Sequence, residues 1–296
     1  MKPSRSTFLQ IRGLRYHVRE WGGEAAPKLF FLHGWMDVSA SFQFAVDALK
    51  EDWHVLAPDW RGFGLTEWAR GGYWFPDYVA DLDALLDRLC PDGPAKLVGH
   101  SMGGNVAGLY AGIRPERVEK LVLAEGFGLP PAEPDRAPRR YAQWLEEIRD
   151  PPQLKTYASF EEVEARLRRN NPRLSASRAQ FLARHWAEEK APGRIELRAD
   201  PLHKMVNPVL YRVEEAMACW RCIAAPTLWL HGDGAWLRGF LKGDEASLDS
   251  YRAAYCNLCE RRIDDAGHMM HHERPEAFAA AIEDFLRAAA GTSGSR

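Results

Sequence analysis

The chain has 296 residues, of which 46% are hydrophobic, so it can bury the core of one large α/β domain with an insertion or of two small domains. Its 39 Lys and Arg against 41 Asp and Glu give a formal net charge of −2, which excludes a global field favouring nucleic acid or an anionic membrane. No run of eighteen apolar residues and no signal-peptide core is visible, so we expect a cytoplasmic protein without a membrane partner, either a monomer or a homodimer.

Short apolar runs alternate with helical patterns along the chain. The first, FLQIRGLRYHVREWG, predicts a hairpin with its turn near Gly13. Strand-like runs follow in KLFFLHG, WHVLAPD, AKLVGHS, VEKLVLAEG, PTLWLHGD and LCERRIDDAGH, and helical periodicity covers 39–49, 75–89, 102–113 and 275–289. This alternation predicts a doubly wound, mostly parallel eight-stranded sheet flanked by helices, with a ligand crevice at the carboxyl ends of the strands.

The alternation breaks over residues 127–207, which contain three helix candidates, RYAQWLEEIRD, FEEVEARLRRN and SRAQFLARHWAEEK, and no convincing strand. Sheet-type runs resume afterwards. We therefore predict a core made of residues 1–126 and 208–296, with 127–207 inserted as a helical cap.

Five cysteines, an odd number, fit a reducing compartment. Four of them form two CxxC pairs, Cys219 with Cys222 and Cys256 with Cys259, a spacing that also occurs in structural zinc sites. Because the first pair lies in a helical pattern and neither has the Gly or Pro of a metal-binding knuckle, we expect buried or half-buried free thiols. Zinc and a redox pair are the alternatives.

The stretch GHSMGG places Ser101 between a strand-like run and a helical pattern, which matches G-x-S-x-G in its expected setting. A sharp turn there strains the backbone and exposes the serine hydroxyl, and the neighbouring glycines avoid a clash with the crossing chain. The following helix directs its positive dipole end toward developing negative charge. Ser101 is therefore the predicted nucleophile.

A serine nucleophile needs a base, and His268 follows the last strand-like run, in the late position that the order Ser, acid, His requires. His271 and His272 are the alternatives for this role. In FLHGW, Gly34 lets the chain turn so that the Trp35 amide, together with the Met102 amide, could bind an oxyanion. We expect His33 to be structural.

Together, HGW, DWRGFGLT, GHSMGG and GHMMHHERPE resemble the α/β-hydrolase superfamily, in its serine-nucleophile, esterase- or lipase-like branch with a helical cap. The resemblance covers essentially the whole chain, with 127–207 in the place of the variable cap. Epoxide hydrolases and haloalkane dehalogenases carry aspartate at the nucleophile position, so Ser101 argues against both. The resemblance also implies an architectural role for Asp59 and Arg61 with the glycines Gly62 and Gly64.

The third member of the triad is the open question. The resemblance implies a G-x-x-D pattern after PTLWLHG, but the residue at that place is Ala235, and Asp233 lies two residues earlier. Glu125 directly follows the preceding apolar run, where a buried carboxylate would need a partner such as an imidazole. We favour Glu125 as the acid, with Asp233 as the fallback. Asp264, Asp265 or no acid at all are the alternatives.

These residues predict a serine hydrolase without cofactor or metal, most simply a carboxylesterase that cleaves a small to medium apolar ester through an acyl-enzyme. The alternatives are a ligand-binding or receptor-like protein with slow turnover, or hydrolysis of a thioester, lactone, amide or C–C bond. Aromatic candidates for the substrate pocket are Trp35, Phe127, Trp74, Phe75, Trp144 and Trp186.

Overall fold

The computed structural model describes residues 1–234 and 245–288, and within them eight strands form one sheet in the order β1-β2-β4-β3-β5-β6-β9-β10. The strands β1 and β2 are antiparallel, β2 is antiparallel to β4, and all remaining neighbours are parallel, so the predicted fold class is confirmed. The strands are β1 (Ser4–Ile11), β2 (Leu14–Trp21), β3 (Lys28–Leu32), β4 (His54–Pro58), β5 (Ala95–His100), β6 (Val118–Ala124), β9 (Thr227–His231) and β10 (Leu258–Arg262).

The hairpin β1–β2 turns at Arg12 and Gly13, which have φ angles of 45° and 83°. Ile11 pairs directly with Leu14, so the loop has two residues, and positive φ at both is the signature of a type I′ turn. This turn matches the right-handed twist of the strands, which explains why a glycine stands at the predicted turn.

Parallel pairing brings the functional ends of the central strands to one edge of the sheet. His100 at the end of β5 pairs with Ala124 at the end of β6, and Ala124 pairs with Leu230 of β9. The residues that follow, Ser101 and Glu125, therefore leave the sheet side by side.

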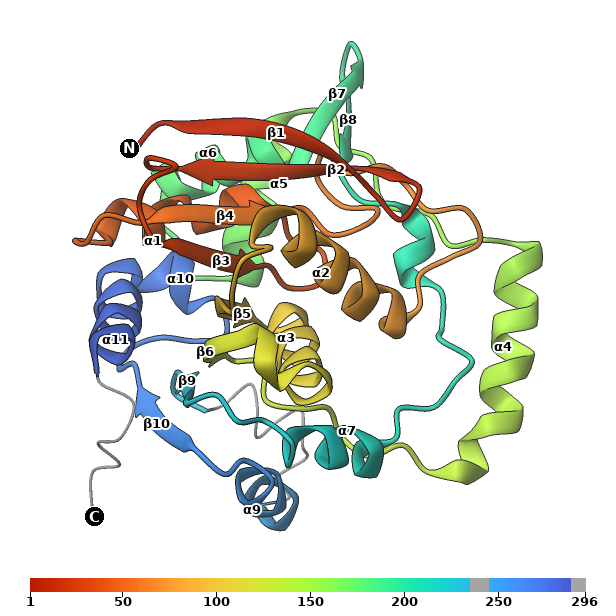
Figure 1. The fold of residues 1–296 in the computed structure, drawn as a ribbon. Helices are drawn as coiled ribbons and strands as arrows, with labels where there is room; N and C mark the ends of the chain where they lie inside the picture. The colour runs from red at the N-terminus through yellow and green to blue at the C-terminus, as the bar shows by residue number, and fades with distance from the viewer. Residues whose placement is uncertain (235–244, 289–296) are drawn as a thin grey trace.

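Helices cover both faces of the sheet (Figure 1). On one face α2 (Phe75–Leu89), α3 (Met102–Ile113), α7 (Val213–Trp220) and α9 (Glu245–Ala253) share one apolar cluster with the strands. On the other face α1 (Gln43–Ala48), α10 (Met270–Glu273) and α11 (Pro275–Arg287) share a second cluster. The helix predicted over 39–49 begins as a 3-10 turn, and position 289, where the last predicted helix ends, lies outside the described residues.

Residues 127–207, which were predicted to be an inserted cap and are called the inserted segment below, contain α4 (Ala137–Arg149), α5 (Phe160–Asn170) and α6 (Ala176–Trp186). A small core of its own includes Val163, Leu182 and Ile195, and Met36 and Phe44 of the main domain pack against it. Helix α4 buries none of its residues and lies at the edge of the molecule (Figure 1).

The expectation that the inserted segment lacks strands is wrong. The residues just after Trp186 were predicted to continue the helix. They form instead the first strand of the antiparallel hairpin β7 (Ala187–Ala191) and β8 (Arg194–Leu197), which turns at Gly193 with φ of 70°. Glu and Lys favour helices when exposed, but Ile195 and Leu197 reach the buried cluster only by alternating along a strand. Tertiary packing therefore overrides the local preference.

Among the helices of the described residues, none is both long enough and apolar enough to cross a bilayer.

Candidate active site

Ser101 lies on the sharp turn between β5 and α3, with φ of 51° and ψ of −117°. A non-glycine residue in this region is strained, and the close crossing of the chain holds it there. A Cβ on Gly103 would lie 2.1 Å from the Leu32 carbonyl oxygen, and a Cβ on Gly99 would lie 2.5 Å from the Gly103 carbonyl oxygen. Only glycine fits at these two positions, so the sequence G-x-S-x-G follows from packing.

His268 lies in the loop between β10 and α10 and faces the serine. Its Nε2 is 3.1 Å from Ser101 Oγ. Its backbone carbonyl accepts a 2.8 Å hydrogen bond from Nε2 of His100, the residue before the serine. His268 is thus held both by its own loop and by β5, the strand that precedes Ser101.

Glu125 directly follows β6, is 3% exposed, and also has a positive φ of 51°. Its Oε1 accepts a 2.7 Å hydrogen bond from the Gly232 amide, and its Oε2 lies 3.8 Å from His268 Nδ1. A distance of 3.8 Å is an ion-pair approach and is longer than a hydrogen bond. The carboxylate is fixed by the neighbouring strand end and faces the ring nitrogen that points away from Ser101.

Asp233 is engaged elsewhere. Its Oδ2 accepts a 2.6 Å hydrogen bond from Arg173 of the inserted segment, and its Oδ1 lies 3.7 Å from Arg262. The other carboxylates considered, Asp264 and Asp265, form ion pairs with Arg262 and Arg274 at the surface. Ala235, the position that the family pattern implies for the acid, lies outside the described residues.

The loop after β3 adjoins the serine at the predicted oxyanion site. A Cβ on Gly34 would lie 3.1 Å from Ser101 Cβ, so the glycine lets this loop approach the nucleophile. Trp35, which follows it, is half exposed, and Met102 is the first residue of α3, where the amide has no partner within the helix. His33 has a structural role: its Nδ1 donates to the Gly34 carbonyl and its Nε2 accepts from the Trp60 amide.

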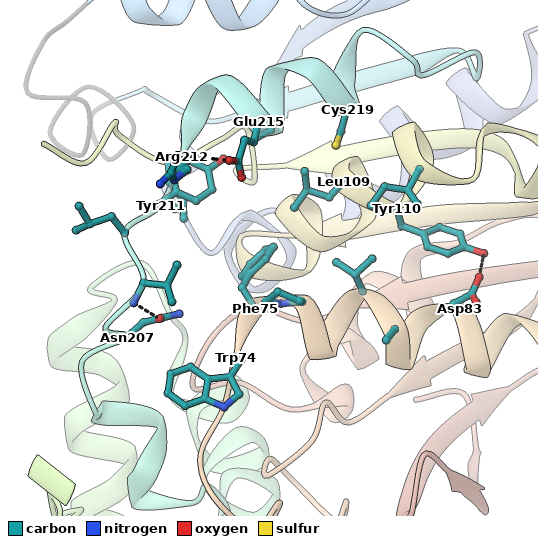
Figure 2. A pocket seen from close by; sticks show the side chains of 18 of the residues that line it. Trp74, Phe75, Asp83, Leu109, Tyr110, Asn207, Tyr211, Arg212, Glu215 and Cys219 are labelled. Atoms are coloured by element: carbon teal, nitrogen blue, oxygen red, sulfur yellow. Dashed lines mark hydrogen bonds and ion pairs between the residues drawn. The ribbon is translucent and has the colours of Figure 1, made fainter. Parts of the chain in front are cut away.

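The aromatic residues predicted for the pocket do not lie together around Ser101. Trp74 and Phe75 line a cavity of about 700 Å³ between α2, α3 and the segment before α7, where their rings face Leu109 and Tyr211 (Figure 2). Trp144 contacts the Trp74 ring but does not line this cavity. Because Ser101 and His268 are not among its lining residues either, the cavity is separate from the predicted catalytic residues.

The remaining predicted aromatics lie elsewhere. Phe127 is 1% exposed and stacks on Trp229 at a ring distance of 4.2 Å, so it is a core residue. Trp186 donates a 2.9 Å hydrogen bond through Nε1 to Oδ1 of Asp37, which links the inserted segment to the main domain. Of this group, Trp35 alone adjoins the serine loop.

In the segment DWRGFGLT, the charged side chains of Asp59 and Arg61 each bind a side chain of another element. Asp59 Oδ2 lies 2.7 Å from His17 Nδ1, and Arg61 forms a two-pronged contact with Asp81 at 2.5 and 2.6 Å. Burial by itself raises the pKa of Asp59, but hydrogen bonding and charge from His17 outweigh it and hold that pKa below its usual value. Asp59 and Arg61 therefore pair with other elements and not with each other.

Sequence reasoning missed a cluster of buried side chains behind His268. His100 contacts the rings of His268 and His271, at centroid distances of 4.9 and 4.3 Å, and Asp37 lies beside His271. Burial, and secondarily the neighbouring His268, lower the pKa of His271 to about 3. The available signal was the presence of histidines in both catalytic motifs, GHS and GHMMHH.

The cysteine pairs do not come together as a metal site. Among the described residues, the group of His, Cys, Asp and Glu side chains with metal-ligand spacing is Asp37, His100 and His271. All five cysteines are free thiols, but the expectation of burial is wrong for Cys222, Cys256 and Cys259, which are exposed because they lie after α7, before β10 and on the edge strand β10.

Comparison with known proteins identifies the family of the chain. A family model described as alpha/beta hydrolase fold matches residues 27–275. The chain is 28% identical to a serine hydrolase-like protein of Danio rerio, covering 90% of this chain and 83% of that protein, and 24% identical to serine hydrolase-like protein 2 of Homo sapiens, covering 91% and 90%. Among solved structures, the thioesterase domain from the curacin biosynthetic pathway is similar with a TM-score of 0.84 and 23% identity, covering 95% of this chain and 99% of that one.

Proposed function

Because the chain belongs to the alpha/beta hydrolase fold family, we propose that it is a serine hydrolase that cleaves carboxylic esters through an acyl-enzyme intermediate. The observation that carries this proposal is the 3.1 Å contact between Ser101 Oγ and His268 Nε2, on a strained turn at the N-terminus of α3. This is the geometry of a hydroxyl nucleophile with its base.

The proposed reaction follows from the positions of the protons. With the Nδ1 proton of His268 directed toward Glu125, Nε2 accepts the Ser101 proton as Oγ attacks the ester carbonyl. The same proton passes to the leaving alcohol, which departs and leaves Ser101 acylated. His268 then removes a proton from water, which attacks the acyl carbon. The bond between the acyl carbon and Oγ breaks, the carboxylic acid leaves, and His268 returns the proton to Ser101 Oγ.

The oxyanion would be held by the backbone amides of Trp35 and Met102. Both residues adjoin Ser101, one through the Gly34 turn and one as the first residue of α3. The open first turn of α3 supplies amide donors and the positive end of the helix dipole, and such donors strengthen as negative charge develops on the carbonyl oxygen.

The proposal is tested by labelling and by turnover. A fluorophosphonate should add one mass increment to the intact protein, located on Ser101, and p-nitrophenyl acetate and butyrate should be turned over continuously. The Ser101→Ala variant should not label and should lose turnover by up to about 10⁶-fold. Unchanged turnover in Ser101→Ala would refute the proposal. A panel of thioester, lactone and amide substrates would then define the bond cleaved.

The 3.8 Å separation between Glu125 and His268 supports a second candidate, a ligand-binding member of the family with slow turnover. A carboxylate beyond hydrogen-bond distance stabilises the imidazolium less well, although such contacts often shorten when substrate binds. Stoichiometric acylation of Ser101 by p-nitrophenyl butyrate without continued release of p-nitrophenol would favour this candidate.

A further inference from the structure

Three buried side chains from separate parts of the chain converge behind the catalytic histidine. Asp37 follows β3, His100 ends β5, and His271 lies in α10, and each is at most 2% exposed. One potential ligand atom from each lies within 4.8 Å of the other two. Asp37 Oδ2 and His271 Nε2 are 3.7 Å apart.

Within this cluster, the atoms that could bind a metal ion are not used in hydrogen bonds. His100 Nε2 donates its proton to the His268 carbonyl, so a neutral His100 ring has a bare lone pair on Nδ1. Within the described part of the chain, His100 Nδ1, His271 Nε2 and Asp37 Oδ2 are buried and have no hydrogen-bond partner. Buried polar atoms without partners are costly, so their convergence requires an explanation.

His100 and Asp37 have the outer contacts of metal ligands, whereas His271 Nδ1 has no hydrogen-bond partner among the described residues. Metal-binding histidines commonly donate their other ring N–H to a carbonyl, as His100 does. The other carboxylate oxygen of Asp37, Oδ1, accepts hydrogen bonds from the Val38 amide, the Ser41 hydroxyl and Trp186 Nε1. These donors fix the carboxylate and leave Oδ2 facing the histidines.

We propose that Asp37, His100 and His271 form a buried site for a divalent transition-metal ion such as Zn²⁺, adjacent to the catalytic residues and separate from them. Two imidazole nitrogens and one carboxylate oxygen are a ligand set that Zn²⁺ favours, with water in the fourth position. Tetrahedral ligands lie about 3.3 Å apart for bonds near 2 Å, so each side chain needs to move by less than about 1 Å. The bound ion would hold His100, and through it the backbone of His268.

The test measures metal content and affinity on the full chain. Protein expressed in zinc-supplemented medium, and protein incubated with excess Zn²⁺, should each retain one Zn²⁺ per chain after desalting, measured by plasma mass spectrometry. His271→Gln should weaken Zn²⁺ binding at least about 100-fold, more than the 10- to 100-fold typical of an outer contact. His185→Gln, a half-buried histidine of the inserted segment, is the matched control and should retain the metal.

Two further measurements keep the proposal testable if His271→Gln does not fold. Trp186→Phe replaces the indole with a smaller aromatic ring and removes the outer N–H donor to Asp37, and should weaken binding about 10- to 100-fold. The Co²⁺-loaded protein should show visible d–d bands without the near-ultraviolet band of a cobalt–thiolate bond, which would indicate the cysteines instead. Absence of retained metal under both loading conditions, a thiolate spectrum, or unchanged affinity in both variants would overturn the proposal.

Discussion

Ser101 and Glu125 occupy equivalent positions at the ends of adjacent parallel strands, and both have a φ angle of 51°. The Ser101 amide donates to the Ala124 carbonyl, and the Glu125 amide donates to the Leu230 carbonyl, each at 2.9 Å. The hydrogen bonds between the strands thus continue up to Ser101 and Glu125 themselves. The register of β5, β6 and β9 therefore places the nucleophile and the carboxylate on the same edge, with His268 between them.

The turn that carries Ser101 should not tolerate a side chain at Gly103. In Gly103→Ala, the new Cβ would meet the Leu32 carbonyl oxygen at 2.1 Å, so backbone must move, and overpacking of this kind costs about 1–3 kcal/mol. Gly108→Ala is the control on the same helix, because its Cβ has room at 3.4 Å or more and should stabilise by about 0.5–1 kcal/mol. Urea denaturation of both variants measures the difference, and equal stabilities would contradict this packing.

The buried contact between Arg61 and Asp81 should be necessary as a pair. Asp81 is fully buried, so Arg61→Leu leaves its charge with fewer partners and should lower the free energy of unfolding by about 3–5 kcal/mol. Adding Asp81→Asn in the same chain should recover part of this loss, since no uncompensated charge then remains. A double-mutant cycle by urea denaturation measures the coupling, and purely additive losses would show that the two side chains act independently.

Stability should fall as the solution becomes acidic, in part through His203. This ring is stacked between Phe63 and Tyr73, and burial lowers its pKa to about 3. The unfolded chain binds the proton near pH 6.5, so His203 contributes fully above pH 6.5 and the contribution is lost as the pH falls toward 3. The slope is about 1.4 kcal/mol per pH unit, or about 2 kcal/mol between pH 6.5 and 5.

The variant His203→Phe separates titration from packing, because phenylalanine keeps the stacking and cannot take up a proton. Its free energy of unfolding should fall less steeply between pH 6.5 and 5 than that of the wild type, whatever its absolute stability at pH 8. An unchanged slope would show that His203 does not titrate with a lowered pKa in the folded protein.

The sheet could be predicted from the sequence because its strands are short apolar runs that end at glycine or polar residues. The sharp turn at Ser101 could be predicted because its motif has local geometric requirements, such as the glycine-only contacts at 99 and 103, whereas the catalytic roles of Ser101 and His268 stay predictions. The hairpin β7–β8 could not be predicted, since only contact with the core of the inserted segment selects a strand there. Phe127 was misplaced for a related reason: an aromatic beside a motif looks the same whether it packs on Trp229 or faces substrate.

The choice between Glu125 and Asp233 also depends on long-range structure. Both follow apolar strands, so local pattern gives each a comparable position. What separates them is the partner that folding supplies: His268 for Glu125, and Arg173 with Arg262 for Asp233. The contact with Arg173 links Asp233 to the inserted segment.

The most direct test of the proposed triad compares kcat for p-nitrophenyl butyrate in Glu125→Gln and Asp233→Asn. Glutamine keeps the size of Glu125 and its contact with the Gly232 amide but removes the charge facing His268, so kcat should fall by up to about 10⁴-fold. Asp233→Asn should retain kcat within a few-fold. The opposite ranking, a large loss in Asp233→Asn with little change in Glu125→Gln, would contradict the assignment of Glu125 as the acid.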